Sequence, residues 1–317
     1  MLNSIPTEAD IISAHNRIKD LINRTPVLSS TTLNSKFQSN IFFKCENFQK
    51  AGAFKSRGAV NVVFSLNETQ ATNGVCTHSS GNHAQALARA AAIRKIPSYI
   101  VMPSNAPKVK VDAVREYGGI ITFCEPNLKA RESTLQSVIK KTNAFEVHPY
   151  NNYDIIAAQA TAGKELIEDA DAELDIILCP VGGGGLLSGT ALSKNYFSNR
   201  TILIACEPKG ADDAYKSFKE GKIIPSIRPN TIADGLLTSL GEKNFEIILK
   251  YVDDIVTVSE DSFVEAMKII YERMKIVVEP SSSVPLAAIL ENKIDIKNKN
   301  VGIIVSGGNV DLGKLPF

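Results

Sequence analysis

The sequence predicts an α/β protein with two open, twisted parallel sheets and flanking helices. Apolar strand-like runs alternate with helix-like patterns along most of the 317 residues. This alternation is typical of parallel sheets that are covered on both faces. A content of 44% hydrophobic and 22% charged residues is that of a soluble globular chain. The length is sufficient for two domains, or for one large domain with an insertion.

The composition excludes several classes of function. Lys and Arg number 35 against 34 Asp and Glu, so no basic surplus indicates nucleic acid or anionic lipid as a partner. The N-terminal residues lack the apolar core of a signal peptide, and no apolar run approaches the ~20 residues of a membrane span. The five cysteines include no Cys-x-x-Cys pair. We therefore expect a cytoplasmic protein without disulfides and with a small-molecule ligand.

The N-terminal half begins with a helix, introduced by a capping box at Thr7 and Asp10 and ended before Pro26. A strand at 41–44 and a helix at 56–66 follow. From residue 75 the alternation is regular and the turns are short. The expected strands are 75–77, 99–102, 120–123 and 144–147. The expected helices are 82–95, 107–117 and 128–140.

The second half continues this alternation. The expected helices are 155–169, 186–196 and 262–274. The expected strands are 175–179, 201–206, 255–258 and 301–305. Residues 221–241 are less regular and predict a long excursion over the surface and the cleft. We predict that 1–74 and 151–317 form a large domain and 75–150 a small mobile domain, with a ligand in the cleft between the sheets.

Lys55 lies at a junction between an apolar run and a helix, within Gly52-Ala53-Phe54-Lys55-Ser56-Arg57-Gly58. A lysine at such a junction can point into a cleft. Burial there lowers its pKa, so more of it is the nucleophilic amine that Schiff-base chemistry requires. An ordinary surface lysine at a helix start is the alternative, which this segment alone does not exclude.

A glycine-rich turn, Pro180-Val181-Gly182-Gly183-Gly184-Gly185-Leu186, follows a predicted strand and opens a helix. Such a turn can aim consecutive N–H groups at one point, and with the helix N-terminus it forms an anion site suited to a phosphate. It matches neither Gly-x-Gly-x-x-Gly nor the P-loop, so a monophosphate group is favoured over nucleotide cofactors of those kinds. A flexible turn is the alternative.

Two further turns carry polar groups after strands. Ser79-Ser80-Gly81-Asn82-His83 offers hydroxyls, an amide and helix N-terminal N–H groups, which together suit a carboxylate. Plain N-capping is the alternative. Ser306-Gly307-Gly308-Asn309 follows the last strand, where parallel sheets present ligands. There Ser306 is either a hydrogen-bonding group for a ligand or a turn serine.

These four motifs, in this order, resemble the fold-type II pyridoxal-phosphate enzymes, whose fold is that of tryptophan synthase β. The resemblance runs from about Thr25 to Asp311. Within the serine/threonine dehydratase family, the chain is most similar to the eukaryotic serine racemases. The resemblance implies that the larger domain binds pyridoxal 5'-phosphate and that an amino acid is the substrate.

The resemblance also assigns roles to residues. Lys55 would be the Schiff-base lysine, Phe54 would line the cofactor ring, and Ser306 would bond the pyridine nitrogen. Asn82 would bond the ring hydroxyl. The phosphate would be held by Gly182, Gly183, Gly184, Gly185 and Leu186. The substrate would be bound by Ser79, Ser80, Asn82, His83 and Thr238.

Ser80 separates members of the family. Racemisation needs an acid/base on each face of a planar carbanion, and the resemblance places Lys55 on one face and Ser80 on the other. The predicted activity is interconversion of L- and D-serine, with β-elimination of serine to pyruvate and ammonia. Some 3-hydroxyaspartate dehydratases share this serine, so a dehydratase of L-serine, L-threonine or 3-hydroxyaspartate is the alternative. A non-catalytic amino-acid sensor of the same fold is a third reading.

Further predictions concern a metal, an effector and a partner. The segment after the strand at 201–206 offers two carboxylates and a carbonyl to a hard cation. In the serine racemase pattern the ligands of Mg²⁺ or Ca²⁺ would be Glu207, the Ala211 carbonyl and Asp213; a solvated acidic turn is the alternative. The resemblance further implies a homodimer, with ATP as an activator at the subunit interface. The matching effector residues are Gln85, Tyr117, Arg273 and Asn309.

The chain also departs from the animal racemases. Glu279-Pro280-Ser281-Ser282-Ser283-Val284 replaces a Thr-Ala-Gly run, Tyr150 replaces an asparagine, and Thr238 replaces a serine of the substrate pocket. These departures leave the preferred substrate and the ratio of racemisation to elimination open.

Overall fold

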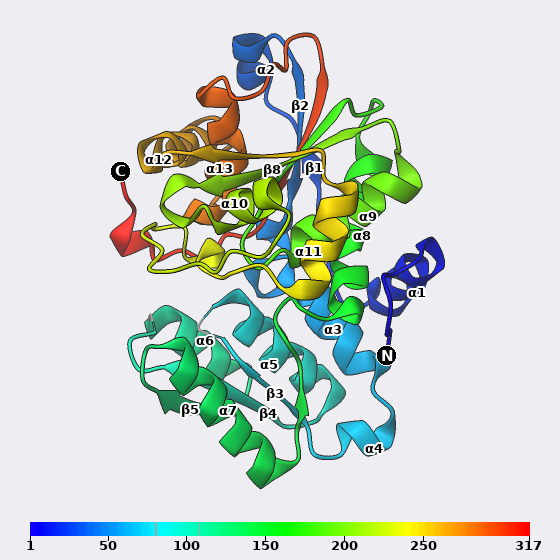
Figure 1. Cartoon of the computed structure of the whole chain (residues 1–317), viewed down its shortest axis with the longest axis vertical. Helices are drawn as coiled ribbons and strands as arrows, with labels where there is room; N and C mark the ends of the chain where they lie inside the picture. The colour runs from blue at the N-terminus through cyan, green and yellow to red at the C-terminus, as the bar shows by residue number, and fades with distance from the viewer. Residues whose placement is uncertain (80, 107) are drawn as a thin grey trace.

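A computed structural model describes residues 1–79, 81–106 and 108–317 of the chain. In these residues the backbone forms a six-stranded sheet and a four-stranded sheet, drawn in the upper and lower parts of Figure 1. Both have the open α/β architecture expected from the sequence, with helices against their faces. A cleft between them is the usual place for a ligand in such folds.

The larger sheet has the strand order β1-β2-β10-β7-β8-β9. All its pairings are parallel except that of β1 with β2. The central strands are buried on both faces, which explains their near-continuous runs of Ile, Val and Leu. The strands are β1 Val27–Leu28, β2 Asn40–Cys45, β7 Ile176–Pro180, β8 Ile202–Pro208, β9 Asp254–Val258 and β10 Asn300–Val305.

The smaller sheet has the order β5-β4-β3-β6, and all its pairings are parallel. Each of its crossovers contains a helix, as a parallel connection requires. Its strands are β3 Val75–His78, β4 Ser98–Pro103, β5 Ile120–Cys124 and β6 Phe145–Glu146. Its helices are α5 Asn82–Arg94, α6 Lys108–Glu116 and α7 Leu128–Thr142.

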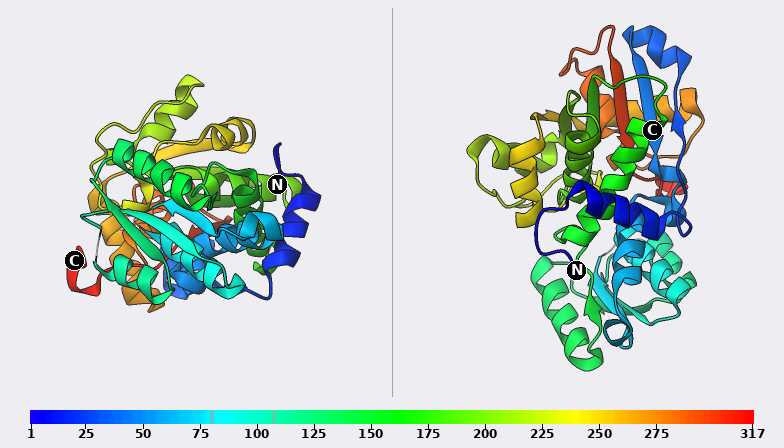
Figure 2. Two further views of the ribbon diagram at one scale, coloured as in Figure 1. Left: turned by 90° about the horizontal axis from the view of Figure 1, so that it is seen from below. Right: turned by 90° about the vertical axis from the view of Figure 1, so that its right-hand side faces the viewer.

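Among the remaining helices, some lie at the junction of the two sheets. Helix α3 packs on α5 of the smaller unit and on α8 of the larger one, so it lies at the junction (Figure 1). The N-terminal helix α1 packs against α3 and α8 beside this junction (Figure 2). The remaining helices are α1 Glu8–Ile18, α2 Thr31–Phe37, α3 Lys55–Ser65, α4 Glu68–Ala71, α8 Tyr153–Asp169, α9 Gly185–Phe197, α10 Asp213–Glu220, α11 Glu242–Tyr251, α12 Glu260–Ile269 and α13 Pro280–Leu290.

Some boundaries differ from the prediction. The Thr7–Asp10 capping box is present, but α1 ends at Ile18, well before the proline that was expected to end it. Helix α12 continues into a π-helical turn at Ile270–Met274. Helices α2, α4, α10, α11 and α13 were not predicted. Two prolines obscured α13, although Pro280 stands in the first turn, where its missing N–H costs little.

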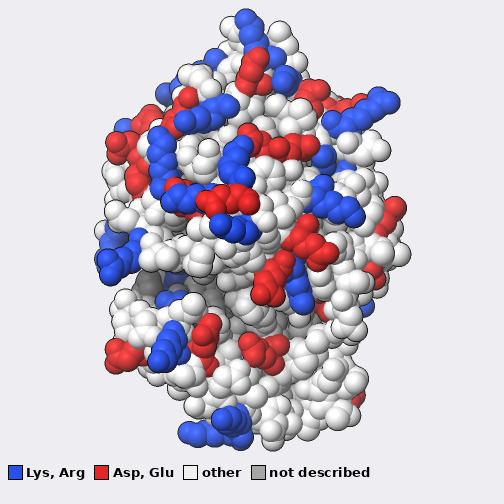
Figure 3. Space-filling model, viewed as in Figure 1, with Lys and Arg blue, Asp and Glu red and all other residues white. Residues whose placement is uncertain are grey.

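The surface is of mixed charge. Figure 3 shows Lys and Arg intermingled with Asp and Glu on one face, and a hollow between the upper and lower parts at the left. The described cysteines are all free. No helix within 1–79, 81–106 and 108–317 has both the length and the hydropathy needed to cross a membrane.

Candidate active site

The predicted motifs converge at the carboxyl ends of the strands. The glycine turn follows β7, Ser79 follows β3, and Ser306 follows β10. Because parallel strands end at one edge of a sheet, this is where doubly wound folds hold ligands. Ser80 lies outside the described residues, so its predicted place in this group has no structural account.

Lys55 is the first residue of α3, as expected for a lysine at a strand-to-helix junction. The chain turns sharply before it, with Ala51 at a φ of 52° and Gly52 at 68°. The Lys55 Nζ donates to the Pro149 carbonyl at 2.8 Å and lies 5.0 Å from the centre of the Phe54 ring. Burial lowers the pKa of Lys55 to about 8, and the charge of Glu279 opposes that shift. The amine is therefore partly neutral near neutral pH.

The glycine turn forms a close-fitting cradle. Gly184 has a φ of 94°, a conformation that favours glycine. A Cβ on Gly182 would lie 2.9 Å from the Gly235 carbonyl oxygen, and one on Gly183 would lie 2.5 Å from the Tyr150 ring. Helix α9 starts at Gly185, and the first N–H groups of a helix have no partner within it. These groups fit a phosphate.

The segment that precedes Lys55 pairs through its backbone with Ser306 and Gly307. The Phe54 N–H donates to the Ser306 carbonyl at 3.0 Å, and Ala53 pairs with Gly307. The Ser306 side chain is buried, with its Oγ 3.0 Å from the Oγ of Ser282. The motifs at residues 55 and 306, far apart in the chain, therefore belong to one site.

Asn82 is already engaged by protein groups. Its Nδ2 donates to the Glu279 carboxylate at 2.9 and 3.1 Å, and its Oδ1 accepts from the Asn309 Nδ2 at 2.9 Å. The Asn309 N–H also donates to Glu279, at 3.2 Å. Burial and the charge of Asp234 raise the pKa of Glu279 to about 7. Glu279 belongs to none of the four sequence motifs, and its one local signal is its position just before Pro280, the first residue of α13.

The predicted substrate residues have different surroundings. The Ser79 Oγ accepts the Gly81 N–H at 3.4 Å. The His83 ring is only 2% exposed and its Nε2 lies 3.0 Å from the Val147 carbonyl. Burial lowers the pKa of His83 to about 3, so the ring is neutral. The His83 side chain is therefore packed in the core, and the group that His83 could offer to a substrate is its backbone N–H at the start of α5.

Tyr150 covers the cradle. A Cβ on Gly183 or Gly185 would collide with Tyr150, and the ring centre lies 5.9 Å from the Lys55 Nζ. Burial raises the pKa of Tyr150, while the Thr238 side chain opposes the shift. The Nδ1 of the neighbouring His148 accepts the Tyr150 and Asn151 N–H groups at 3.2 and 2.8 Å. Thr238 thus lies beside Tyr150, which replaces an asparagine of the animal racemases.

The candidate metal ligands lie at the end of β8. Glu207 is completely buried and accepts the N–H groups of Ala214 and Tyr215, each at 2.9 Å. Asp213 is 4% exposed, and neither of its carboxylate oxygens accepts a well-formed hydrogen bond from a described residue. Burial raises the pKa of Glu207 to about 9 and that of Asp213 to about 6. The alternative of a solvated acidic turn is therefore wrong, and two buried carboxylates beside Ala211 fit a cation that would replace their protons.

No group of three or more His, Cys, Asp or Glu side chains within the described ranges is arranged to hold a metal. The candidate set at Glu207 and Asp213 supplies two carboxylates, so it depends on the Ala211 carbonyl and on water to complete a shell.

The four predicted effector residues are only partly brought together. Gln85 and Asn309 line a small cavity of about 140 Å³, together with Lys110. Tyr117 and Arg273 do not line it. Lys110 forms an ion pair with Asp234 across the two halves of the molecule. A separate hollow of about 400 Å³, between α2 and residues 292–297, includes none of the predicted site residues.

Comparisons with known proteins agree with this geometry. The family model described as "Pyridoxal-phosphate dependent enzyme" matches residues 18–307. A beta-hydroxyaspartate dehydratase of Paracoccus denitrificans is 51% identical, over 99% of this chain and 99% of the relative. A serine racemase of Dictyostelium discoideum is 47% identical, over 98% of this chain and 96% of the relative.

A solved structure agrees with these sequence relatives. The crystal structure of serine racemase from Dictyostelium discoideum superposes with a TM-score of 0.92 at 48% identity, covering 96% of this chain and 99% of that one. The buried amine of Lys55, the glycine cradle and the buried Ser306 hydroxyl fit the aldehyde, phosphate and ring of pyridoxal phosphate. The chain therefore belongs to the pyridoxal-phosphate-dependent enzymes, among relatives that include racemases and ammonia-lyases.

Proposed function

We propose that this enzyme interconverts L- and D-serine and also eliminates water from serine to give pyruvate and ammonia. One observation carries the proposal: the buried amine of Lys55 lies 5.9 Å from the ring centre of Tyr150, and the same Tyr150 packs against the glycine cradle suited to the cofactor's phosphate. The 47% identity to a serine racemase supports this choice of reaction.

The cofactor supplies an electron sink for the α-carbon of the bound amino acid. The N–H groups of Gly182–Leu186 would hold its phosphate, and the Ser306 hydroxyl would donate to the pyridine nitrogen. A neutral serine at this place makes a weaker sink than a carboxylate would, which suits α-proton removal and β-elimination. Lys55 Nζ would hold the cofactor before substrate arrives and then carry the proton to or from the α-carbon.

Ser80 is proposed as the second acid/base. A reaction that inverts the α-carbon must remove a proton on one face and return it on the other. In the sequence Ser80 stands between Ser79 and Asn82, two of the predicted substrate contacts. We propose that Ser79, Asn82, the His83 N–H and Thr238 complete the substrate site, with Tyr150 as a wall.

A dehydratase is the second candidate. The 51% identity to a beta-hydroxyaspartate dehydratase favours 3-hydroxyaspartate as a substrate, and L-serine and L-threonine are the other candidates. Removal of the α-proton by Lys55, followed by loss of the β-hydroxyl, would require no proton donor on the opposite face. Relative kcat/KM on these three substrates distinguishes the alternatives.

We further propose that residues 75–150 move as a small domain against a large domain formed by 1–74 and 151–317. The four-stranded sheet falls within the smaller range, and the Lys110–Asp234 ion pair bridges to residues outside it. Closure would exclude water from the substrate site.

Metal, effector, assembly and location are also proposals. Glu207, the Ala211 carbonyl and Asp213 would hold Mg²⁺ or Ca²⁺, supported by the two buried carboxylates. ATP would activate a cytoplasmic homodimer by binding at the subunit interface, supported by the small cavity that Gln85 and Asn309 line. The matching effector residues on the sequence also include Tyr117 and Arg273.

The test is a chiral assay of purified enzyme with L-serine, with and without Mg²⁺ and ATP. D-serine together with pyruvate is the expected result. Pyruvate without D-serine would reject the racemase and favour a dehydratase. Absence of both products, with rapid turnover of 3-hydroxyaspartate, would assign the enzyme to that substrate. If no substrate turns over and no cofactor is bound, the sensor interpretation holds.

A further inference from the structure

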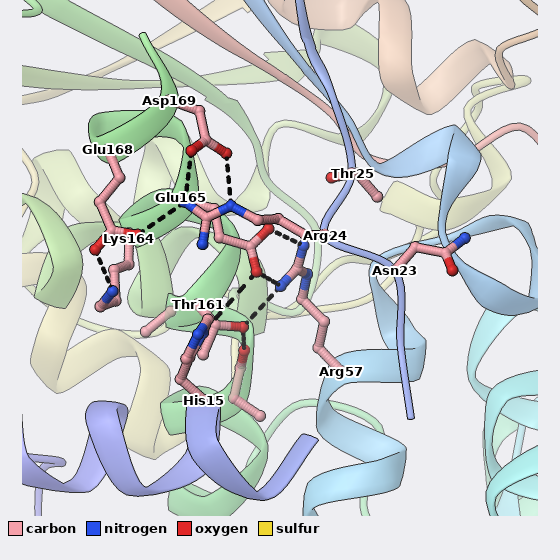
Figure 4. Close-up of polar contacts among 12 residues, drawn as sticks. His15, Asn23, Arg24, Thr25, Arg57, Thr161, Lys164, Glu165, Glu168 and Asp169 are labelled. Atoms are coloured by element: carbon pink, nitrogen blue, oxygen red, sulfur yellow. Dashed lines mark hydrogen bonds and ion pairs between the residues drawn. The ribbon is translucent and has the colours of Figure 1, made fainter. Parts of the chain in front are cut away.

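Four charged side chains are buried together beneath the helix that carries Lys55. Lys44, Glu46 and Arg57 are 0% exposed, and Glu165 is 1% exposed. They come from β2 and the turn after it, from α3 and from α8. Figure 4 shows Arg57 and Glu165 pointing toward one another. Two cations face two anions, so the group is neutral overall. The proposed chemistry uses none of these residues.

Arg57 is the centre of this group. Its Nε and one terminal nitrogen donate to the two oxygens of Glu46, both at 2.7 Å. Its two terminal nitrogens donate to the two oxygens of Glu165, at 2.8 and 2.7 Å. A hydroxyl, that of Thr161, accepts a further bond at 3.0 Å. One guanidinium thus makes two bidentate carboxylate pairs, the geometry that fixes orientation most strongly.

Lys44 completes the group. Its Nζ lies 2.7 Å from a Glu165 oxygen and donates to the Thr25 carbonyl, also at 2.7 Å. Burial alone would raise the pKa of Glu165, but the Arg57 and Lys44 bonds lower it to about 2. The carboxylate is therefore ionised at any pH at which the enzyme would work. The Nδ1 of His15, on α1, lies 4.0 Å from a Glu165 oxygen.

The group lies between the two elements that hold the ends of the cofactor. Arg57 is two residues after Lys55 on α3, whereas Glu165 is on α8. Helix α8 packs closely on α9: a Cβ on Gly189 would lie 2.5 Å from the Ala160 nitrogen. Helix α9 begins at the glycine cradle. Helix α8 is therefore the rigid spacer between the Lys55 helix and the cradle.

We propose that Arg57 and Glu165 are positioning residues. Their bidentate hydrogen bonds fix the distance between the Lys55 amine and the glycine cradle. Stability alone does not explain such a group. Apolar residues of similar volume often stabilise a core as well as a buried ion pair does, or better. Geometry does explain it, since a misplacement of about 1 Å can cost a reaction ~10²-fold. The inference rests on the proposed role of Lys55 in capturing the cofactor.

The test compares variants that separate stability from position. Glu165→Gln removes one charge at constant shape. Arg57→Lys keeps the charge but cannot form the bidentate hydrogen bonds of the guanidinium. The double variant Arg57→Met/Glu165→Leu replaces the pair by apolar side chains and leaves Lys44 and Glu46 with equal and opposite charges. Arg24→Gln is the matched control: Arg24 also pairs with two carboxylates of α8, Glu168 and Asp169, but its side chain is 48% exposed.

The readout is capture of pyridoxal phosphate by the cofactor-free protein, not turnover. Each protein is mixed with pyridoxal phosphate, reduced with borohydride at successive times, and analysed by peptide mass spectrometry for the adduct on Lys55. The series is repeated between about pH 6 and about pH 10, on either side of the ordinary lysine range. Thermal unfolding of each variant is measured in parallel, and capture is compared well below each midpoint.

We expect capture at Lys55 to slow by a factor on the order of 10 to 100 in both single variants and in the double variant. The midpoint of its pH dependence moves up from about 8, because a displaced amine regains water. The double variant recovers thermal stability without recovering capture. Arg24→Gln captures the cofactor as the wild type does.

Two results would overturn the inference. One is a double variant that recovers both stability and the capture rate, since the pair would then serve stability alone. The other is unchanged capture by folded Glu165→Gln, which decides the matter if the double variant does not fold. Failure of the wild type itself to form an adduct on Lys55 would instead reject the proposed function, so the two failures are distinguishable.

Discussion

The amide of Asn82 and the carboxylate of Glu279, 197 residues apart, form a two-contact hydrogen bond at 2.9 and 3.1 Å in the middle of the site. Asn82 begins a helix of the smaller unit, and Glu279 precedes a helix of the larger one. The pair therefore ties the two halves of the molecule together beside Lys55. The Glu279 charge also acts on Lys55, where it partly offsets the effect of burial on the pKa.

Glu279→Gln should lower the pKa of Lys55 further below its usual value. Burial lowers that pKa to about 8, and the Glu279 charge is the influence that raises it. Without the charge, the amine loses its proton at lower pH, so cofactor capture by Lys55 should reach its plateau at lower pH. Borohydride trapping across pH measures this. Glu220→Gln, at an exposed position, is the control; a midpoint that stays at about 8 in Glu279→Gln contradicts the assignment.

Ser80→Ala should separate the two proposed activities. Loss of the second acid/base removes D-serine formation, by a factor on the order of 10² to 10⁴, while Lys55 continues to support some elimination of L-serine. Chiral chromatography and a pyruvate assay on the same samples measure both products. Ser133→Ala on the exposed face of α7 is the control. A variant that retains D-serine formation, or that loses both products equally, contradicts the role of Ser80.

Stability should fall with rising pH when no divalent cation is present. In the folded protein the pKa of Glu207 is raised to about 9 from 4.5, and that of Asp213 to about 6 from 3.8. The folded state thus binds protons that the unfolded state has released, so this stabilisation is full below about pH 4 and is lost as the pH rises toward 9.

A bound cation should replace those protons. The increase in Tm on adding Mg²⁺ or Ca²⁺ is therefore expected to be larger at about pH 8 than at about pH 6. Asp213→Asn should abolish the increase, whereas Asp212→Asn, at the half-buried neighbouring position, should preserve it. Calorimetry with and without EDTA provides the measurement. An equal Mg²⁺ effect in both variants would place the cation elsewhere.

Gly183→Ala should weaken cofactor binding through the Tyr150 wall. The added Cβ would lie 2.5 Å from the Tyr150 ring, so either the ring or the cradle must shift. We expect a loss of pyridoxal-phosphate affinity on the order of 10-fold, about that of one strong hydrogen bond to a charged group. Fluorescence titration of the cofactor-free protein measures it. Gly118→Asn is the control, because no described atom lies within 4 Å of its Cβ position and asparagine tolerates its φ of 78°.

Local pattern was sufficient for much of the fold. Helix α5 and strand β10 were predicted to within a residue, because alanine-rich and branched apolar runs are unambiguous when both sides are buried. Helix α13 was missed, because its two prolines and three serines resemble a loop. Strand β1 is two residues long, too short for any alternation to appear.

The site residues likewise differ in whether a local sequence pattern could predict them. Lys55 and the glycine cradle have local signals, a junction and a turn, so sequence could place them. The contact of Asn82 with Glu279 joins segments nearly two hundred residues apart, and the four buried charges that include Arg57 come from four separate elements. No local pattern predicts which buried charges meet, because that depends on how the helices pack.

Peptide mapping of the borohydride-reduced holoenzyme tests the central claim most directly. The account predicts one pyridoxyl adduct, on the peptide that carries Lys55, and none in Lys55→Ala. An adduct on another lysine, such as the nearby Lys50, or a wild-type enzyme that forms no adduct while still turning over substrate, would contradict it.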